Sequence, residues 1–175
     1  SAAPTARSAV NIPPSTISST TNRQRAICTK RSQHCLPHLF IIYSTMKIND
    51  DVIQQMIAQA QKDAPLETCG YLLGNDGVVT ENYWMENIDH SSEHFSFAPK
   101  DQFAALKYAR TKHLKILANW HSHPASPSRP SQEDIRLAND PTIRYAILSL
   151  HDGIHLNSFK ILQGEVVDKE SHYEG

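Results

Sequence analysis

The sequence lacks any long hydrophobic run. Its longest candidate, Leu39–Tyr43, has only five residues, whereas a membrane-spanning helix needs roughly 20 consecutive apolar residues. We therefore expect no membrane span and no membrane partner. A hydrophobic fraction of 39% over 175 residues is instead typical of a soluble globular protein whose single domain has a real core.

Cysteine is scarce as well. The three cysteines are Cys28, Cys35 and Cys69, and two of them precede residue 46. The rest of the chain therefore has one cysteine, which excludes a disulfide framework there. A reducing cytosol is the simplest setting for such a protein, so we expect a cytoplasmic location.

Acidic residues are absent from residues 1–45, which hold five Lys or Arg and 13 Ser or Thr. Such a segment, with no helical or strand periodicity, rarely buries enough apolar surface to offset its ordering entropy. Either it is an organelle transit peptide, which it resembles in composition, or it is a disordered, non-native upstream segment. The second interpretation is favoured because Met46 opens a strand-then-helix pattern at once. Residues 46–175 then form one domain.

Positive charge is in deficit in residues 46–175. This part of the chain has 12 basic and 18 acidic residues, a net charge of about −6 with histidine neutral. A negative domain has no general affinity for nucleic acid phosphates. We therefore expect no nucleic acid partner.

Hydrophobic periodicity and turn residues outline the elements of this domain. Strands are predicted over residues 46–48, 68–73, 78–85, 114–120, 144–150 and 155–162, with a further edge at 166–167, and helices over residues 50–64, 99–113 and 131–139. Strands interleaved with helices and hairpins predict an α/β (mixed α+β) domain, in which two to three helices flank a central mixed, largely antiparallel β-sheet.

Two histidines stand at the end of the strand predicted over residues 114–120, in the sequence His121-Ser122-His123-Pro124. Side chains at i and i+2 of a strand project to the same face, so both imidazoles can meet one metal ion. By itself a His-x-His pair is common in strands and indicates nothing. Its context decides its meaning.

Asp134 follows this pair after a proline- and serine-rich loop, at the start of the helix predicted from Ser131. Ser131-x-x-Asp134 is also close to a helix capping box. The two interpretations are compatible, because the Ser131 backbone can cap the helix while its hydroxyl faces a metal. A catalytic zinc takes three protein ligands, such as neutral histidines and a carboxylate, and leaves a position for water. The pattern predicts one Zn²⁺ per chain, bound by His121, His123 and Asp134.

A hydrolytic zinc site also needs a group that moves protons. Glu67 is the best candidate, because it stands at the entrance to the otherwise apolar strand over residues 68–73. A charge there is costly if it is buried, so it is either solvated or functional. In context, we predict that Glu67 activates a water molecule.

A glutamate before a Cys-Gly strand, then His-Ser-His-Pro, then Ser-x-x-Asp is a pattern that resembles the JAMM (MPN-plus) metallopeptidases. The resemblance covers roughly residues 46–169, including the Phe-Ser-Phe-Ala-Pro segment at 95–99. It implies the MPN/JAMM fold, which is cytidine-deaminase-like. It also implies that Glu67 is the acid/base, that His121, His123 and Asp134 bind zinc, and that Ser131 helps to stabilise the oxyanion. All five positions hold the required residue type, so an active enzyme is expected.

The resemblance also narrows the substrate. The domain, about 130 residues long, is similar to small stand-alone prokaryotic members of the family, without the insertions of ubiquitin-chain enzymes. This implies an amide or isopeptide hydrolase that acts on the C-terminal tail of a ubiquitin-like sulfur-carrier protein, either releasing an amino acid such as cysteine or trimming the tail to a Gly-Gly end. The alternatives are a deubiquitinase-like or general peptidase of the same fold, or a non-catalytic scaffold module.

Other zinc proteins fit less well. A DNA-repair-associated relative shares the His-x-His-Pro element, but its following loop contains glycine, whereas residues 124–130 have none. A nucleoside deaminase needs a Pro-Cys-x-x-Cys ligand pair, which this sequence lacks. We interpret Cys69 as a small buried hydrophobic residue, Trp120 as a packing residue and Ser122 as facing away from the histidines.

Overall fold

The structure is a computed structural model that describes residues 45–175. The predictions for the N-terminal segment, apart from Thr45, lie outside the described residues. Within the described range, the elements in chain order are β1 (Lys47–Ile48), α1 (Asp50–Asp63), β2 (Cys69–Asn75), β3 (Val78–Met85), α2 (Pro99–Thr111), β4 (Lys115–His123), α3 (Gln132–Leu137), β5 (Arg144–Ser149), β6 (His155–Leu162) and β7 (Glu165–Glu174). None of these helices is long and apolar enough to cross a membrane.

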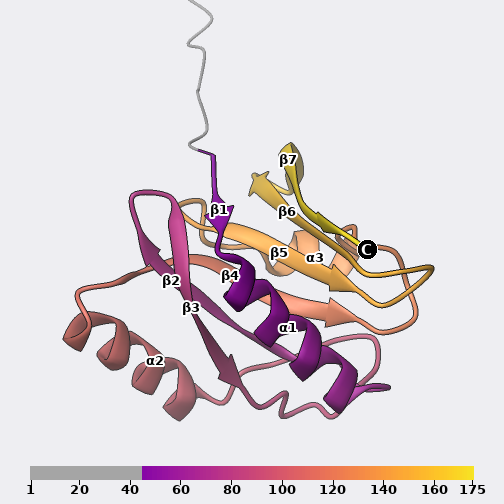
Figure 1. Cartoon of the computed structure of the whole chain (residues 1–175), viewed down its shortest axis with the longest axis horizontal. Coiled ribbons are helices and arrows are strands. Elements are labelled where there is room, and N and C mark those ends of the chain that lie inside the picture. The colour runs from indigo at the N-terminus through magenta and orange to yellow at the C-terminus, as the bar shows by residue number, and fades with distance from the viewer. Residues whose placement is uncertain (1–44) are drawn as a thin grey trace, which may run out of the picture. The chain divides into compact units, whose positions relative to one another are not determined.

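The strands form one seven-stranded sheet in the order β1-β3-β2-β4-β5-β6-β7 (Figure 1). The β1–β3 and β4–β5 pairs are parallel, and the other four pairs are antiparallel. This confirms the predicted fold class, a mixed and largely antiparallel sheet with flanking helices. The central position of β4 matters most for function, because this strand carries both predicted histidine ligands.

Helix α1 covers one face of the sheet. Its apolar residues recur every three or four positions and are all buried: Val52, Ile53, Met56, Ile57 and Ala60. They pack against sheet residues such as Leu72, Trp120 and Leu148. Burial of one such side chain contributes roughly 1.5–3 kcal/mol, so this apolar layer is the main core of the domain.

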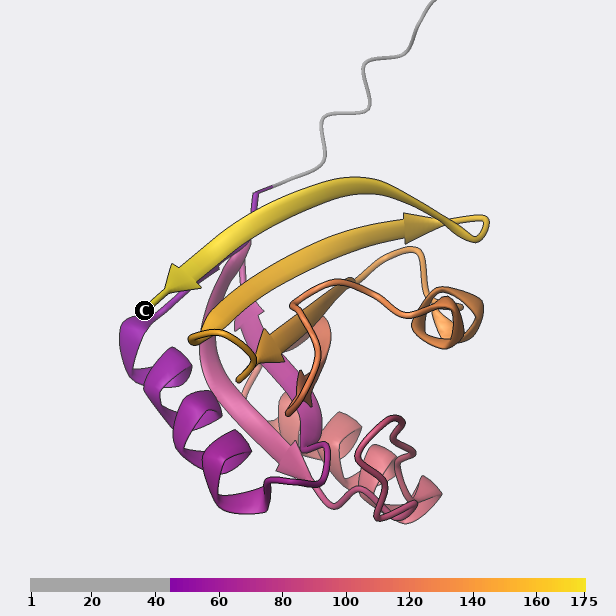
Figure 2. The ribbon, with the colours of Figure 1, turned by 90° about the vertical axis from the view of Figure 1, so that its right-hand side faces the viewer.

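The opposite face of the sheet carries α2, α3 and the loop over residues 86–98 (Figure 2). A smaller apolar cluster of Ile147, Phe159 and Ile161 lies there, and Ile135 and Ala138 from the α3 region pack on it. Helix α3 is thereby fixed beside the end of β4. This placement brings the predicted site residues of the two elements together.

Three strands extend beyond their predicted bounds. Strand β4 continues through His123 instead of ending at Trp120, and β2 continues to Asn75. The hairpin turn is therefore only Asp76-Gly77, where both residues have positive φ angles of 51° and 77°, as a two-residue hairpin turn requires. Strand β7 has 10 residues, whereas the sequence indicated only an edge at 166–167.

Candidate active site

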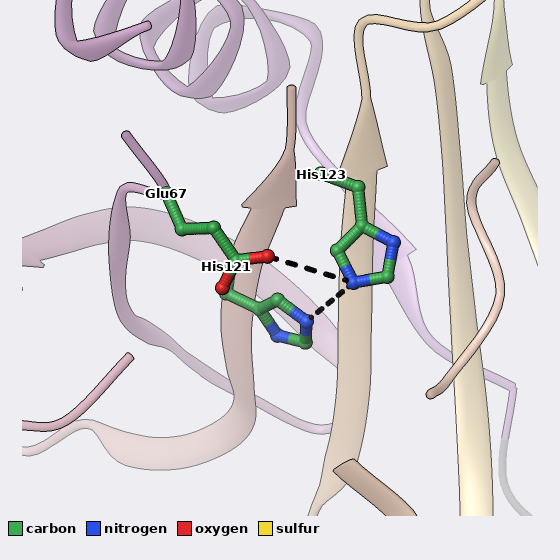
Figure 3. Close-up of side chains that lie close together, drawn as sticks. All are labelled: Glu67, His121 and His123. Carbon is green, nitrogen blue, oxygen red and sulfur yellow. Dashed lines mark hydrogen bonds and ion pairs between the residues drawn. The ribbon is translucent and has the colours of Figure 1, made fainter. Parts of the chain in front are cut away.

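Strand alternation places His121 and His123 on the face of β4 that points away from α1. Both side chains are buried, and their Nε2 atoms lie 3.0 Å apart (Figure 3). Ala118 and Trp120, on the same strand, belong instead to the core under α1. The predicted histidine pair therefore converges on one point.

Glu67 reaches this point because β2 and β4 are antiparallel neighbours. Cys69 is paired with His121, so the position two residues before Cys69 lies beside His123. Thr68 and Ser122 extend this register, since the backbone N–H of Ser122 donates to the Thr68 carbonyl at 2.8 Å and the Thr68 N–H donates to Ser122 Oγ at 2.9 Å. Glu67 Oε1 lies 3.9 Å from His123 Nε2, and Glu67 Oε2 has no hydrogen-bond partner although it is buried.

Asp134 arrives from the first turn of α3. Its Oδ1 lies 3.3 Å from His121 Nε2 and its Oδ2 lies 3.7 Å from His123 Nε2. The Ser131 N–H donates to Asp134 Oδ2 at 2.7 Å, and Ser131 Oγ accepts from the Asp134 N–H at 3.0 Å. The capping box is thus complete. The Ser131 hydroxyl takes part in it, beyond the backbone role expected from the sequence.

The capping contacts also bear on what Ser131 can do. Its hydroxyl oxygen is an acceptor in the cap, so its own proton stays free to donate elsewhere. Ser131 is exposed, unlike Glu67 and the two histidines, which are buried. An oxyanion role for Ser131 stays a prediction.

The loop after β4 orients His123. His123 Nδ1 lies 3.0 Å from the Pro127 carbonyl oxygen. The loop is held in turn by Ser128, whose hydroxyl donates to the Ile147 carbonyl at 2.6 Å, and by the Ser149 hydroxyl, which donates to the Ser126 carbonyl at 2.7 Å. A hydrogen bond from Nδ1–H to a carbonyl leaves Nε2 as the unprotonated nitrogen, which is the usual arrangement behind a metal ligand.

Sequence reasoning missed Asn87, which clamps Glu67 from behind. Asn87 is buried, and its Nδ2 donates to the Glu67 carbonyl at 3.0 Å and to the His94 carbonyl at 3.1 Å. The Glu67 N–H donates to the Ser91 carbonyl at 2.8 Å. The loop over residues 86–98 therefore fixes the Glu67 backbone from both sides. A single asparagine in a loop offers no periodic signal by which it could have been found.

The same loop supports a histidine ligand. The Phe95 ring stacks on the His121 imidazole with a centroid distance of 4.6 Å and an interplanar angle of 26°. Phe95 also packs edge-on against Phe97. The aromatic pair thus covers one side of the site and restricts rotation of His121.

Burial sets the proton affinity of Glu67. It raises the pKa of this carboxyl from 4.5 to about 7, although the nearby His123 lowers it. Removal from water disfavours the charged form of a carboxylic acid. A carboxyl with a pKa near neutrality can both accept and donate a proton under ordinary conditions.

The other three groups respond to one another. Burial lowers the pKa of His121, against the pull of Asp134. Burial also disfavours charge on His123 and Asp134, but hydrogen bonds and neighbouring charges outweigh it. Asp134, the Pro127 carbonyl and Glu67 act on His123, and His121, His123 and Ser131 act on Asp134. The pKa of His123 is therefore raised, and that of Asp134 falls well below its usual range. An anionic carboxylate beside two imidazoles favours a positive charge between them.

These groups suit a metal cation. One ligand atom from each of Glu67, His121 and His123 lies within 4.8 Å of the others, and Asp134 places two oxygens beside the same ring nitrogens. Imidazole nitrogens with carboxylate oxygens form a ligand set that zinc accepts. The unpaired, buried Glu67 Oε2 gives the site a further acceptor with no partner in the described chain. The residues therefore fit the predicted zinc.

A family model described as prokaryotic homologs of the JAB domain, Prok-JAB, matches residues 49–162. The chain belongs to the Prok-JAB family. This confirms the resemblance to small prokaryotic JAMM/MPN proteins drawn from Glu67, the histidine pair and Asp134. The match covers every one of these residues.

Several Prok-JAB relatives are known. A CysO-cysteine peptidase of Mycobacterium tuberculosis is 28% identical over 126 residues, which are 70% of this chain and 86% of the relative. A desampylase of Pyrococcus furiosus is 27% identical over 93 residues, which are 53% of this chain and 66% of the relative. The solution structure of a Desulfitobacterium hafniense protein is 39% identical with a TM-score of 0.67, over 74% of this chain and 92% of that one. Peptidase names among the relatives support hydrolase activity.

Two residues near the site, Cys69 and Trp120, are buried packing residues, as the sequence indicated. Cys69 is fully buried, its Sγ lies 3.6 Å from the Met85 carbonyl, and burial raises the pKa of its thiol to about 12. A thiol with a raised pKa forms little thiolate, which is the form that binds metals and reacts with oxidants. Trp120 is also fully buried and donates to Asn82 Oδ1 at 2.8 Å on the α1 side of the sheet.

Proposed function

We propose that this Prok-JAB protein is a zinc-dependent metallopeptidase that hydrolyses an amide or isopeptide bond at the C-terminus of a ubiquitin-like sulfur-carrier protein. The observation that carries the proposal is the convergence of Glu67 with His121 and His123 in one buried site. The names CysO-cysteine peptidase and desampylase support the substrate class. In this proposal His121, His123 and Asp134 hold the metal.

A bound zinc ion polarises a carbonyl group and makes water at the site more acidic. Glu67 removes a proton from the attacking water through Oε2, which has no hydrogen-bond partner among residues 45–175. The water oxygen then forms a bond to the carbonyl carbon, and the carbon–nitrogen bond breaks. Glu67 returns its proton to the departing amine, for which a pKa of about 7 suits it in both directions.

Ser131 assists at the carbonyl oxygen. Its hydroxyl oxygen already accepts from the Asp134 N–H, which fixes the position of the group. The hydroxyl proton is then directed at the negative charge that develops in the transition state, where a prepositioned donor is most effective. The water attacks directly, so the reaction proceeds without a covalent enzyme intermediate.

The test uses the full chain, purified without chelator and supplied with zinc. It is incubated with a sulfur-carrier protein that bears an amino acid at its C-terminus, and release is followed by mass spectrometry. We expect release by the wild type and none above background by Glu67→Gln. No release by the wild type, or equal release by both, would refute the proposal. Ubiquitin dimers and plain peptides, run in parallel, report the two other peptidase activities. A zinc content near zero points to a scaffold module.

A further inference from the structure

Asn157 interrupts an apolar stripe on the site face of the sheet. It lies on β6 opposite Ile147, and Ile147 is paired in turn with His121, so the three side chains share one row and one face. The next two residues of β6 on that face, Phe159 and Ile161, pack with Ile147 in an apolar cluster. Asn157 is buried as well, and a buried amide costs free energy unless it is hydrogen-bonded. The partners of this amide therefore indicate its role.

Both nitrogen atoms of Asn157 bind one residue of the loop after β4. The side-chain Nδ2 of Asn157 donates to the Ser128 carbonyl at 3.1 Å, and its backbone N–H donates to Ser128 Oγ at 3.2 Å. The Ser128 hydroxyl donates in turn to the Ile147 carbonyl at 2.6 Å. Ser128 is buried and is thereby anchored to both β5 and β6.

The anchored serine fixes the carbonyl group that contacts His123. The Pro127 carbonyl and the Ser128 nitrogen belong to one planar peptide unit, so holding Ser128 restricts the direction of the Pro127 oxygen. That oxygen lies 3.0 Å from His123 Nδ1 and also accepts from the Arg129 N–H at 2.8 Å. A carbonyl oxygen has two lone pairs, and these two contacts use both. Asn157 therefore acts on His123 through the loop, from a strand two places away in the sheet.

We propose that Asn157 is a positioning residue for the metal ligand His123. It holds Ser128, and Ser128 fixes the Pro127 carbonyl. That carbonyl keeps a proton of His123 on Nδ1, so that Nε2 faces the metal as the unprotonated nitrogen. The inference rests on the proposed function, which makes His123 a zinc ligand, and it extends the support of the site from the loop to β6.

The test compares the zinc affinity of the wild type with that of Asn157→Leu. Leucine is close to asparagine in size, suits the adjoining apolar cluster and removes the amide. The full chain is titrated with zinc in competition with a chromophoric chelator. We expect the variant to bind zinc roughly 10-fold more weakly, as is usual when a partner behind a metal ligand is lost. The matched control is Asn82→Leu, which removes an amide that accepts from Trp120 Nε1 on the α1 side. It should lower stability and keep the wild-type zinc affinity.

A second measurement follows His123 itself. In the wild type the NMR signal of the His123 Nδ1 proton should exchange slowly with solvent, because the proton is held by a carbonyl. Asn157→Leu should speed this exchange, and Asn82→Leu should leave it unchanged. A merely structural role for Asn157 predicts that both variants lose urea stability alike while zinc affinity and the proton signal stay at their wild-type values. That result would overturn the proposal.

Ser128→Ala tests the same linkage from the loop. It removes the hydroxyl contacts to Ile147 and Asn157. Because both substitutions break one chain of contacts, the double variant should lose little more zinc affinity than the weaker-binding single variant; fully additive losses refute the linkage. If Asn157→Leu does not fold, wild-type zinc affinity in Ser128→Ala refutes it instead. A wild type that binds no zinc contradicts the proposed function, whereas the Nδ1 proton in the metal-free protein still decides the role of Asn157.

Discussion

The two faces of β4 differ in chemistry: one is apolar and packs in the core, and the other carries polar side chains. On the α1 side, Ala118 and Trp120 are fully buried in an apolar core, and the indole N–H of Trp120 donates to Asn82 Oδ1. On the other side, His121 and His123 contact each other and Asp134, and Asn119 Oδ1 has no hydrogen-bond partner within residues 45–175. One strand thus supplies both the packing that stabilises the domain and the groups that we propose act on a substrate, and period-two alternation keeps the two apart.

The face of β4 that carries the histidines is also less favourable for stability than the face that packs against α1. Glu67, His121 and His123 are buried, and Glu67 Oε2 has no hydrogen-bond partner within residues 45–175, which costs free energy. The apolar face and the clamping loop over residues 86–98 hold them in place nonetheless. A cluster of buried titratable groups with shifted pKa values is characteristic of functional sites.

The largest effect expected is on catalysis. Glu67→Gln keeps the size of the side chain but removes its capacity to take a proton, so kcat/KM on a carrier adduct should fall by roughly 10²- to 10⁴-fold. Zinc content, measured by atomic absorption, should stay at one per chain. If the activity of the variant stays within threefold of the wild type, Glu67 is not the group that transfers the proton.

The two faces can be separated directly by neighbouring substitutions. Trp120→Ala should lower the free energy of unfolding by about 3–5 kcal/mol through the cavity it leaves, measured by urea denaturation in the presence of chelator. His121→Ala should abolish zinc binding with a smaller loss of stability in chelator. The comparison breaks down if Trp120→Ala loses zinc while it remains folded, or if His121→Ala retains zinc.

In the absence of metal, the buried charge of Glu67 should lower the stability of the domain. Its pKa of about 7 in the folded state lies above the value of 4.5 for the free group, so the folded state binds the proton more tightly. The contribution of the Glu67 carboxyl to the free energy of unfolding is therefore fully present below pH 4.5. It is lost as the pH rises through 7, and a shift of this size corresponds to about 3 kcal/mol. In chelator, the free energy of unfolding of Glu67→Gln, relative to that of the wild type, should therefore increase between pH 5 and pH 8.

Urea unfolding at the two pH values measures this gain. Glu165→Gln, at an exposed position on β7, controls for the general effect of losing a carboxylate. If the difference in stability between Glu67→Gln and the wild type is the same at pH 5 and pH 8, burial does not raise the pKa of Glu67.

The smallest effect concerns the clamp behind Glu67. Asn87→Asp keeps the acceptor oxygen but loses the donors to the Glu67 and His94 carbonyls, at a cost of about 1–3 kcal/mol in stability. We expect kcat to fall more than KM changes, since the position of the base is disturbed and the substrate contacts are not. If KM alone rises, Asn87 serves substrate binding and not the placement of Glu67.

Much of the fold was predictable because local signals were strong. The apolar stripe of α1, the strand β3 and the strand β6 have the predicted bounds to within one or two residues. Strand β7 was missed because its sequence is largely polar and lacks the apolar alternation that marks a strand, so that only its hairpin pairing with β6 defines it. The extension of β4 through His123 depends likewise on its neighbours β2 and β5.

The sequence by itself determined which residue types could carry the chemistry. The spacing of His121 and His123 fixed their common face, and Ser131 with Asp134 fixed a helix start, because these are properties of neighbouring residues on regular backbone. Only the tertiary structure decided that Glu67 lies beside His123 and that Asn87 and Phe95 hold the site. These facts arise from strand order, register and loop packing between segments far apart in the chain, and local sequence does not encode such distances.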